Sequence, residues 1–194
     1  MNTLDKLEKQ IGVSFKNKKI LENAFIHRSY LNEHKSHPLP SNEKLEFLGD
    51  SVLSLITSMY LYSKYPILHE GDYTEIKSAI VKTGSLADAS RKLNLGTYLF
   101  LSKGEEEGKG RENTNILADC FEALIAAIFI DQGFDYAYEF VITYLFGDQL
   151  ARIVEKKEYF AAKSKLQEVV QGKYKQTPIY QIKKEEGPEH DRTF

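Results

Sequence analysis

The stretch Asn42–Leu53 reads NEKLEFLGDSVL and places three carboxylates in a segment whose apolar spacing is otherwise that of a core helix. At about 100° per residue, Glu43, Glu46 and Asp50 fall within an arc of about 60° on that helix. Glu46 and Asp50 are one turn apart, and a like-charged pair at this spacing destabilises a helix, more so when it is partly buried. The pattern therefore indicates that a positive group lies between these two side chains.

The helix is predicted to begin just after Ser41 or Asn42, either of which is a suitable N-cap. Phe47 lies off the main apolar stripe, and Gly49 lies within the helix, where it costs about 1 kcal/mol relative to Ala. A close approach by another helix would explain Gly49. The stripe itself is formed by apolar residues at helical spacing: Leu45, Leu48, Val52, Leu55, Ile56 and Met59.

A second segment, residues 116–130, reads ILADCFEALIAAIFI and is apolar almost all round, which predicts a central buried helix. Thr114 or Asn115 is expected to cap it. Its only charges, Asp119 and Glu122, are three residues apart and therefore share a face. Two acidic pairs with no basic residue on either face indicate one shared cation site. The alternative is that a Lys or Arg from elsewhere in the fold pairs with each of them.

The chemistry of the candidate ligand atoms indicates which metal ions the site would bind. Four carboxylates without a His or Cys at ligand spacing form an all-oxygen set, which suits Mg²⁺ or Mn²⁺. A ferritin-like di-iron site would have a His three residues after a Glu, and a zinc site is not expected because the chain has one Cys. Mg²⁺ held by carboxylates usually binds phosphate oxygens, which points to phosphoryl-transfer or phosphodiester chemistry.

Three further stretches accompany the 42–53 motif in a fixed order. They are IHRSYLNE at 26–33, EGDYTEIKSAIV at 70–81 and GRENTNILADCFEALIAAIFIDQG at 110–133. This ordered set resembles the signature motifs of the ribonuclease III family and covers most of the first 150 residues. The resemblance implies a mainly α fold, with an all-helical endonuclease domain over residues 1–150.

The resemblance also implies roles for individual residues. It assigns the family's catalytic and metal-binding quartet to Glu46, Asp50, Asp119 and Glu122, with Glu122 as the expected bridging ligand. In that family these residues bind Mg²⁺, for which Mn²⁺ can substitute, and activate water to cut double-stranded RNA, leaving 5′-phosphate and 3′-hydroxyl ends. Two ions about 4 Å apart could stabilise the attacking and leaving oxygens together.

Other matched positions carry weaker implications. Glu43 and Glu70 match acidic positions near the family's RNA cleft, although each could equally be an ordinary solvated acid. The family forms homodimers packed around the signature motif, so Phe47 and Gly49 are candidate interface residues. His27 is expected to be a hydrogen-bonded structural histidine, and contact with RNA or ions is the alternative.

The C-terminal part shows a second resemblance. After a charged linker at 151–160, residues 161–194 resemble the first half of a double-stranded-RNA-binding domain of the α-β-β-β-α type. No residues match the later strands and the basic second helix, so we expect a truncated sequence, a partial module docked on the nuclease or a disordered segment, and in each case weak RNA binding. The matched positions are a helix at Lys163–Val170 with Gln167 and Glu168 as 2′-hydroxyl contacts, a strand at Ile179–Lys184 and a minor-groove contact at His190.

Composition agrees with a cytoplasmic, non-membrane protein. The single Cys fits a reducing compartment, and no apolar run approaches the roughly 18 residues that span a membrane. The net charge of −2 is unusual for a protein that binds a polyanion, but residues 152–194 carry 10 Lys and Arg against 7 Asp and Glu. The Gly-rich stretch 104–112 is predicted to be a mobile loop, with Lys109 and Arg111 as possible phosphate contacts.

The sequence therefore predicts a Mg²⁺-dependent, homodimeric endoribonuclease that cuts both strands of duplex RNA during processing of ribosomal and messenger precursors. One alternative is a catalytically silent member of the same fold that binds RNA or acts as a scaffold. A more distant alternative is a helical carboxylate-bridged metal oxidoreductase, which the missing Glu–His spacing disfavours.

Overall fold

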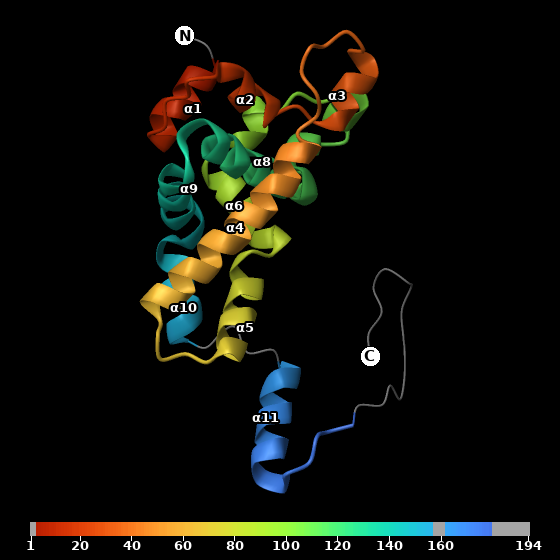
Figure 1. Ribbon diagram of the computed structural model, residues 1–194. Helices are drawn as coiled ribbons and strands as arrows, with labels where there is room; N and C mark the ends of the chain where they lie inside the picture. The colour runs from red at the N-terminus through yellow and green to blue at the C-terminus, as the bar shows by residue number, and fades with distance from the viewer. Residues whose placement is uncertain (1–2, 157–161, 180–194) are drawn as a thin grey trace. The chain divides into compact units, whose positions relative to one another are not determined.

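The structure is a computed structural model that describes residues 3–156 and 162–179 (Figure 1). The chain divides into two compact units, Met1–Tyr159 and Phe160–Phe194. The described residues are helical and contain no strand, which confirms the predicted mainly α fold; an isolated parallel bridge joins Ile26 to Phe100. The helices of the first unit are α1 (Thr3–Ile11), α2 (Lys18–Asn23), α3 (Arg28–Glu33), α4 (Glu43–Lys64), α5 (Glu70–Ile80), α6 (Thr83–Lys92), the 3₁₀ turn η1 (Leu95–Tyr98), α7 (Lys103–Glu107), the 3₁₀ turn η2 (Gly110–Glu112), α8 (Thr114–Gln132), α9 (Phe134–Val141), the π-helical turn η3 (Ile142–Phe146) and α10 (Gly147–Glu155).

Helix α8 is the centre of the first unit, as its apolar sequence predicts. Its residues 123–128 are all fully buried, and α4, α6 and α9 pack against it. The N-cap is Asn113, whose side-chain oxygen accepts hydrogen bonds from the backbone N–H groups of Asn115 and Ile116. The prediction of Thr114 or Asn115 as the cap was therefore wrong: both are already in the helical turn that Asn113 caps.

Helix α4 crosses the near face of the unit in Figure 1 and packs on α8. It begins after Asn42, one of the two predicted caps, but the Asn42 side chain donates to the Ala24 carbonyl and makes no capping bond. Leu55 and Met59 were predicted to belong to the core stripe, and this was wrong, because they are 52% and 46% exposed. The apolar arc of α4 is wider than the face that α8 and its neighbours cover.

Gly49 lies where α4 and α8 approach most closely. A Cβ atom at this position would lie 1.9 Å from the backbone oxygen of Glu122. No residue other than Gly fits there, which explains a glycine within a helix despite its cost. The contact also sets the register of the two helices, since Glu46 precedes Gly49 by one turn and Asp119 precedes Glu122 by one turn.

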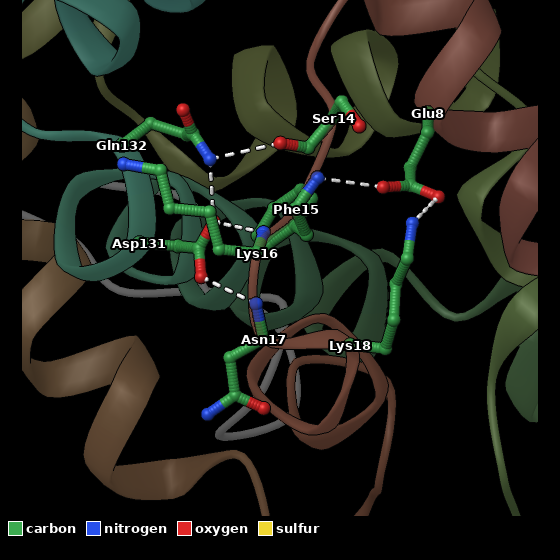
Figure 2. Close-up of polar contacts among 8 residues, drawn as sticks. All are labelled: Glu8, Ser14, Phe15, Lys16, Asn17, Lys18, Asp131 and Gln132. Atoms are coloured by element: carbon green, nitrogen blue, oxygen red, sulfur yellow. Dashed lines mark hydrogen bonds and ion pairs between the residues drawn. The ribbon is translucent and has the colours of Figure 1, made fainter.

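The segment after α1 is held by hydrogen bonds to α1 and to the end of α8 (Figure 2). The Asp131 carboxylate at the end of α8 accepts hydrogen bonds from the backbone N–H groups of Lys16 and Asn17, each 2.8 Å long. The Glu8 carboxylate accepts from the Phe15 N–H at 2.7 Å. The bonds to Lys16 and Asn17 hold the pKa of Asp131 below its usual value despite some desolvation.

The stretch 104–112 is ordered into α7 and η2, so the prediction of a mobile loop was wrong. Arg111 explains the order: its Nε donates to Glu106 at 2.7 Å, and its Nη1 donates to the carbonyl oxygens of Gly96 and Leu99. Through these hydrogen bonds the Arg111 guanidinium holds α7 and η2 against η1. Arg111 is therefore a structural residue instead of the phosphate contact that the sequence suggested.

The described helix of the second unit is α11 (Ala162–Tyr174), which confirms the helix predicted over Lys163–Val170. Gln167 and Glu168 lie within it. The strand predicted at 179–184 lies outside the described residues except for its first position, and His190 lies outside them entirely. None of the described helices is long and apolar enough to cross a membrane. The domain boundaries and the cytoplasmic location stay predictions.

Candidate metal centre

Three of the four predicted carboxylates converge on one point. Glu46 on α4 and Asp119 and Glu122 on α8 each offer one oxygen, and these oxygens all lie within 4.8 Å of one another. All three side chains are half-buried. Helical periodicity puts each pair on one face, and the Gly49 contact brings the two faces together.

Asp50 lies next to this group but outside it. It is exposed, one turn beyond Glu46 on α4, and its carboxylate is not among the oxygens that share the 4.8 Å neighbourhood. Its negative charge nevertheless acts on the group, because it raises the pKa values of both Glu122 and Glu46.

The electrostatics of the cluster favour a cation. Burial, followed by the charges of Asp50, Glu46 and Asp119, raises the pKa of Glu122 to about 8. Burial is also the main cause that raises the pKa values of Glu46 and Asp119. Among the described residues, no Lys or Arg forms an ion pair with any of the four carboxylates. An all-oxygen donor set with uncompensated negative charge fits a hard divalent ion.

A polar cleft of about 630 Å³ opens in front of Glu46 and Asp119. Glu43 also lines this cleft, and its carboxylate is 3.8 Å from the Arg28 guanidinium; its supporting role toward RNA, which the family resemblance implied, stays a prediction. Sequence reasoning did not single out several residues that line it, although the motifs at 26–33 and 110–133 contain most of them. These are Arg28, Asn32, Glu105, Asn113 and Asn115.

His27 also lines the cleft, where it caps α3. Its Nδ1 accepts a hydrogen bond from the Ser29 N–H and contacts the Ser29 hydroxyl at 2.8 Å. Burial lowers the pKa of His27, which favours the neutral ring. His27 is hydrogen-bonded as predicted, and the alternative of contact with RNA or ions stays open because the ring lines the cleft.

Three other predicted residues, Glu70, Gly49 and Phe47, contribute no carboxylate to the cluster. Glu70 begins α5, accepts a hydrogen bond from the Thr74 hydroxyl and is not among the residues that line the cleft of the same chain. Gly49 is buried against α8 of its own chain, so we reassign it from the predicted dimer contact to intrachain packing. Phe47 is 78% exposed, and its side chain is available to a partner.

Residues 17–149 match the family described as Ribonuclease-III-like. The chain belongs to the ribonuclease III family. It is 46% identical over 187 residues to a protein called Ribonuclease 3 from Treponema denticola, which covers 96% of this chain and 75% of that one. A second Ribonuclease 3, from Dehalococcoides mccartyi, is 43% identical over 194 residues and covers 100% of this chain and 81% of the relative.

Solved structures agree with this membership. The nuclease domain of ribonuclease III from Campylobacter jejuni superimposes with a TM-score of 0.68 at 36% identity, over 74% of this chain and 96% of that one. Dicer from Pichia stipitis gives a TM-score of 0.52 at 26% identity, over 91% of this chain and 78% of that one. Ribonuclease III enzymes depend on a metal, and the Glu46, Asp119 and Glu122 cluster could hold one.

Proposed function

We propose that this chain is a Mg²⁺-dependent endoribonuclease that hydrolyses phosphodiester bonds in double-stranded RNA, as in the processing of ribosomal and messenger precursors. The observation that carries the proposal is the cluster of Glu46, Asp119 and Glu122 at a polar cleft, in a chain of the ribonuclease III family. The relatives named Ribonuclease 3 support the same activity.

Glu46, Asp119 and Glu122 would hold the metal ion, and Asp50 would join them through its own carboxylate or through water. Mg²⁺ is favoured because it takes oxygen ligands and usually keeps several waters. When bound, it lowers the pKa of a coordinated water and neutralises charge on phosphate oxygens. Burial, followed by the charges of Asp50, Glu46 and Asp119, raises the pKa of Glu122, so its ionised form is unfavourable without such a charge.

The reaction adds water across a P–O bond of the backbone. The water oxygen bonds to phosphorus, the bond from phosphorus to the 3′ oxygen breaks, and that oxygen takes up a proton to leave 5′-phosphate and 3′-hydroxyl ends. Of the four carboxylates of the predicted quartet, Glu46 and Asp119 line the cleft and would face a phosphodiester bound there. They orient the attacking water and accept its proton when ionised.

We further propose that two copies associate through the exposed face of α4. Phe47 and Tyr62 are 78% and 77% exposed on this helix, and Leu55 and Met59 are about half exposed. Uncovered apolar side chains along one helix face are typical of an interface. A solved nuclease domain of ribonuclease III from Campylobacter jejuni is described as having structural flexibility in a region involved in dimer formation.

Replacing Glu122 with Gln tests the proposed activity. The change keeps the size of the side chain but removes one ligand charge from the cluster, so we expect kcat on duplex RNA in Mg²⁺ to fall by at least about 100-fold. The measurement is single-turnover cleavage of a labelled RNA duplex, with circular dichroism to verify folding.

Glu139→Gln is the matched control, because Glu139 is an exposed acid on α9 outside the cleft. It should cleave like the wild type. Cleavage by Glu122→Gln at the wild-type rate would contradict the proposed mechanism. A wild-type protein that binds duplex RNA in Mg²⁺ without cutting it would instead identify the silent, RNA-binding alternative.

A further inference from the structure

The cleft in front of the metal centre is acidic except at one position. Among the described residues that line it, Arg28 carries the only fixed positive charge, whereas Glu43, Glu46, Glu105 and Asp119 are acidic. A phosphate backbone that enters such a cleft is repelled by carboxylates whose charge no cation offsets. Among the described residues that line the cleft, Arg28 is therefore the one that can form an ion pair with a backbone phosphate.

Arg28 is held by a weak contact that it can leave. Its Nη1 is 3.8 Å from Glu43 Oε1, and the two side chains are 73% and 56% exposed. An exposed pair at this distance contributes little to stability. The other oxygen of Glu43 accepts a hydrogen bond from the Ser41 hydroxyl at 2.7 Å, so Glu43 keeps a partner when Arg28 moves away.

The backbone of Arg28, in contrast, is fixed. It is the first residue of α3, between His27, which caps the helix, and Ser29, which bonds to the His27 ring. The charge of Arg28 also acts on the cluster, since it opposes the rise in the pKa values of Glu46 and Asp119. A fixed backbone position with a weakly held guanidinium suits recognition of phosphate, because a guanidinium can bind a phosphate through two parallel N–H donors.

We propose that Arg28 binds a backbone phosphate of the RNA duplex next to the scissile one, and that it does so by exchanging its contact with Glu43 for the phosphate. The inference rests on the proposed function. It assigns Arg28 to substrate binding and Glu43 to holding Arg28 at the cleft before RNA arrives, while the cluster of Glu46, Asp119 and Glu122 remains the site of hydrolysis.

Arg28→Gln tests the proposal through the salt dependence of binding. In Ca²⁺, so that binding is measured apart from cleavage in Mg²⁺, we expect the Kd for a duplex to rise about tenfold at low salt. The slope of log Kd against the logarithm of the salt concentration should fall by about 0.9 for each phosphate contact that the loss of Arg28 removes. In Mg²⁺, KM should rise in parallel while kcat stays within about threefold.

Three variants separate this role from a structural one. Arg28→Lys should restore the salt slope but only part of the affinity, because Lys keeps the charge and loses the paired donors. Glu43→Gln should tighten binding more in the wild type, about twofold to threefold, than in Arg28→Gln, because only the wild type gains the released Arg28 in addition to the loss of a repelling charge. Arg91→Gln is the control, since Arg91 also forms an ion pair, with Asp88, but lies outside the cleft.

Weaker binding by Arg28→Gln with an unchanged salt slope would overturn the proposal and leave Arg28 a structural residue. The two proposals can fail separately. If the wild type cuts duplex RNA while Arg28→Gln keeps its KM and its slope, only the role of Arg28 is contradicted. If the wild type neither binds nor cuts duplex RNA, the proposed function fails.

Discussion

At the scale of single residues, the close approach of Gly49 to Glu122 does most to build the site. The carboxylates of α4 and α8 meet because a missing side chain lets the two backbones cross at that point. The position therefore links packing to chemistry: whatever separates the helices at Gly49 also separates Glu46 from Asp119 and Glu122.

Gly49→Ala should destabilise the protein. Ala usually stabilises a helix relative to Gly by about 1 kcal/mol, but here its Cβ would overlap the Glu122 carbonyl oxygen, and overpacking of this kind costs about 1–3 kcal/mol. We expect a net loss in the free energy of unfolding, measured by urea denaturation, together with weaker cleavage of duplex RNA.

Gly84→Ala provides the control, because Gly84 lies in α6 with nothing within 4 Å of an added Cβ. This variant should be as stable as the wild type or more stable, by up to about 1 kcal/mol. If both substitutions had the same effect, the close approach at Gly49 would not be what constrains that position.

At the scale of elements, three arcs of α4 face three different environments. One arc, with Val52 and Ile56, is buried; a second, with Glu43 and Glu46, faces the cleft; and a third exposes apolar side chains. Sequence periodicity alone merges the first and third arcs, because both consist of apolar residues. This is why Leu55 and Met59 were assigned to the core.

Phe47→Ser tests the third arc. Removing an exposed aromatic anchor from a helix-mediated interface should shift the dimer toward the monomer, with a dissociation constant at least about tenfold higher. Sedimentation equilibrium at several protein concentrations measures this shift.

Tyr136→Ser is matched to this change, since Tyr136 is an aromatic residue 51% exposed on α9 instead of α4. It should leave the association unchanged. A wild-type chain that stays monomeric at high concentration, or a Phe47→Ser variant that associates as the wild type does, would count against the α4 interface.

At the scale of the whole molecule, we expect the acidic cluster to couple folding to metal binding. The carboxylates repel one another in the folded state, and Mg²⁺ that binds only this state should stabilise it by about 2.7 kcal/mol at 100 times its Kd. We expect the melting temperature to rise with Mg²⁺ concentration at constant ionic strength, as measured by calorimetry after treatment with EDTA.

In Glu122→Gln, this Mg²⁺-dependent rise should be much smaller, because one ligand charge is missing. The same variant should be at least as stable as the wild type in EDTA, because Gln carries no charge that burial and the neighbouring carboxylates make unfavourable in the folded state. An equal rise in both proteins would show that Mg²⁺ acts elsewhere on the molecule.

The sequence by itself determined the helical class, the two helices that carry the carboxylates and the family. These follow from local periodicity and from ordered motifs, which need no knowledge of how helices pack. Residues Glu46, Asp50, Asp119 and Glu122 could be selected in this way because charges on an apolar helix are unfavourable unless something compensates them.

Only the tertiary structure decided which chain surfaces meet. It packed Gly49 against α8 of the same chain and hydrogen-bonded Arg111 to backbone carbonyl oxygens. It also placed Arg28 in the lining of the cleft and Glu70 outside that lining. Such outcomes depend on contacts between residues far apart in sequence, and periodicity carries no information about them. The two acidic pairs could be identified from the sequence, whereas the crossing of α4 and α8 that brings them together was decided by packing.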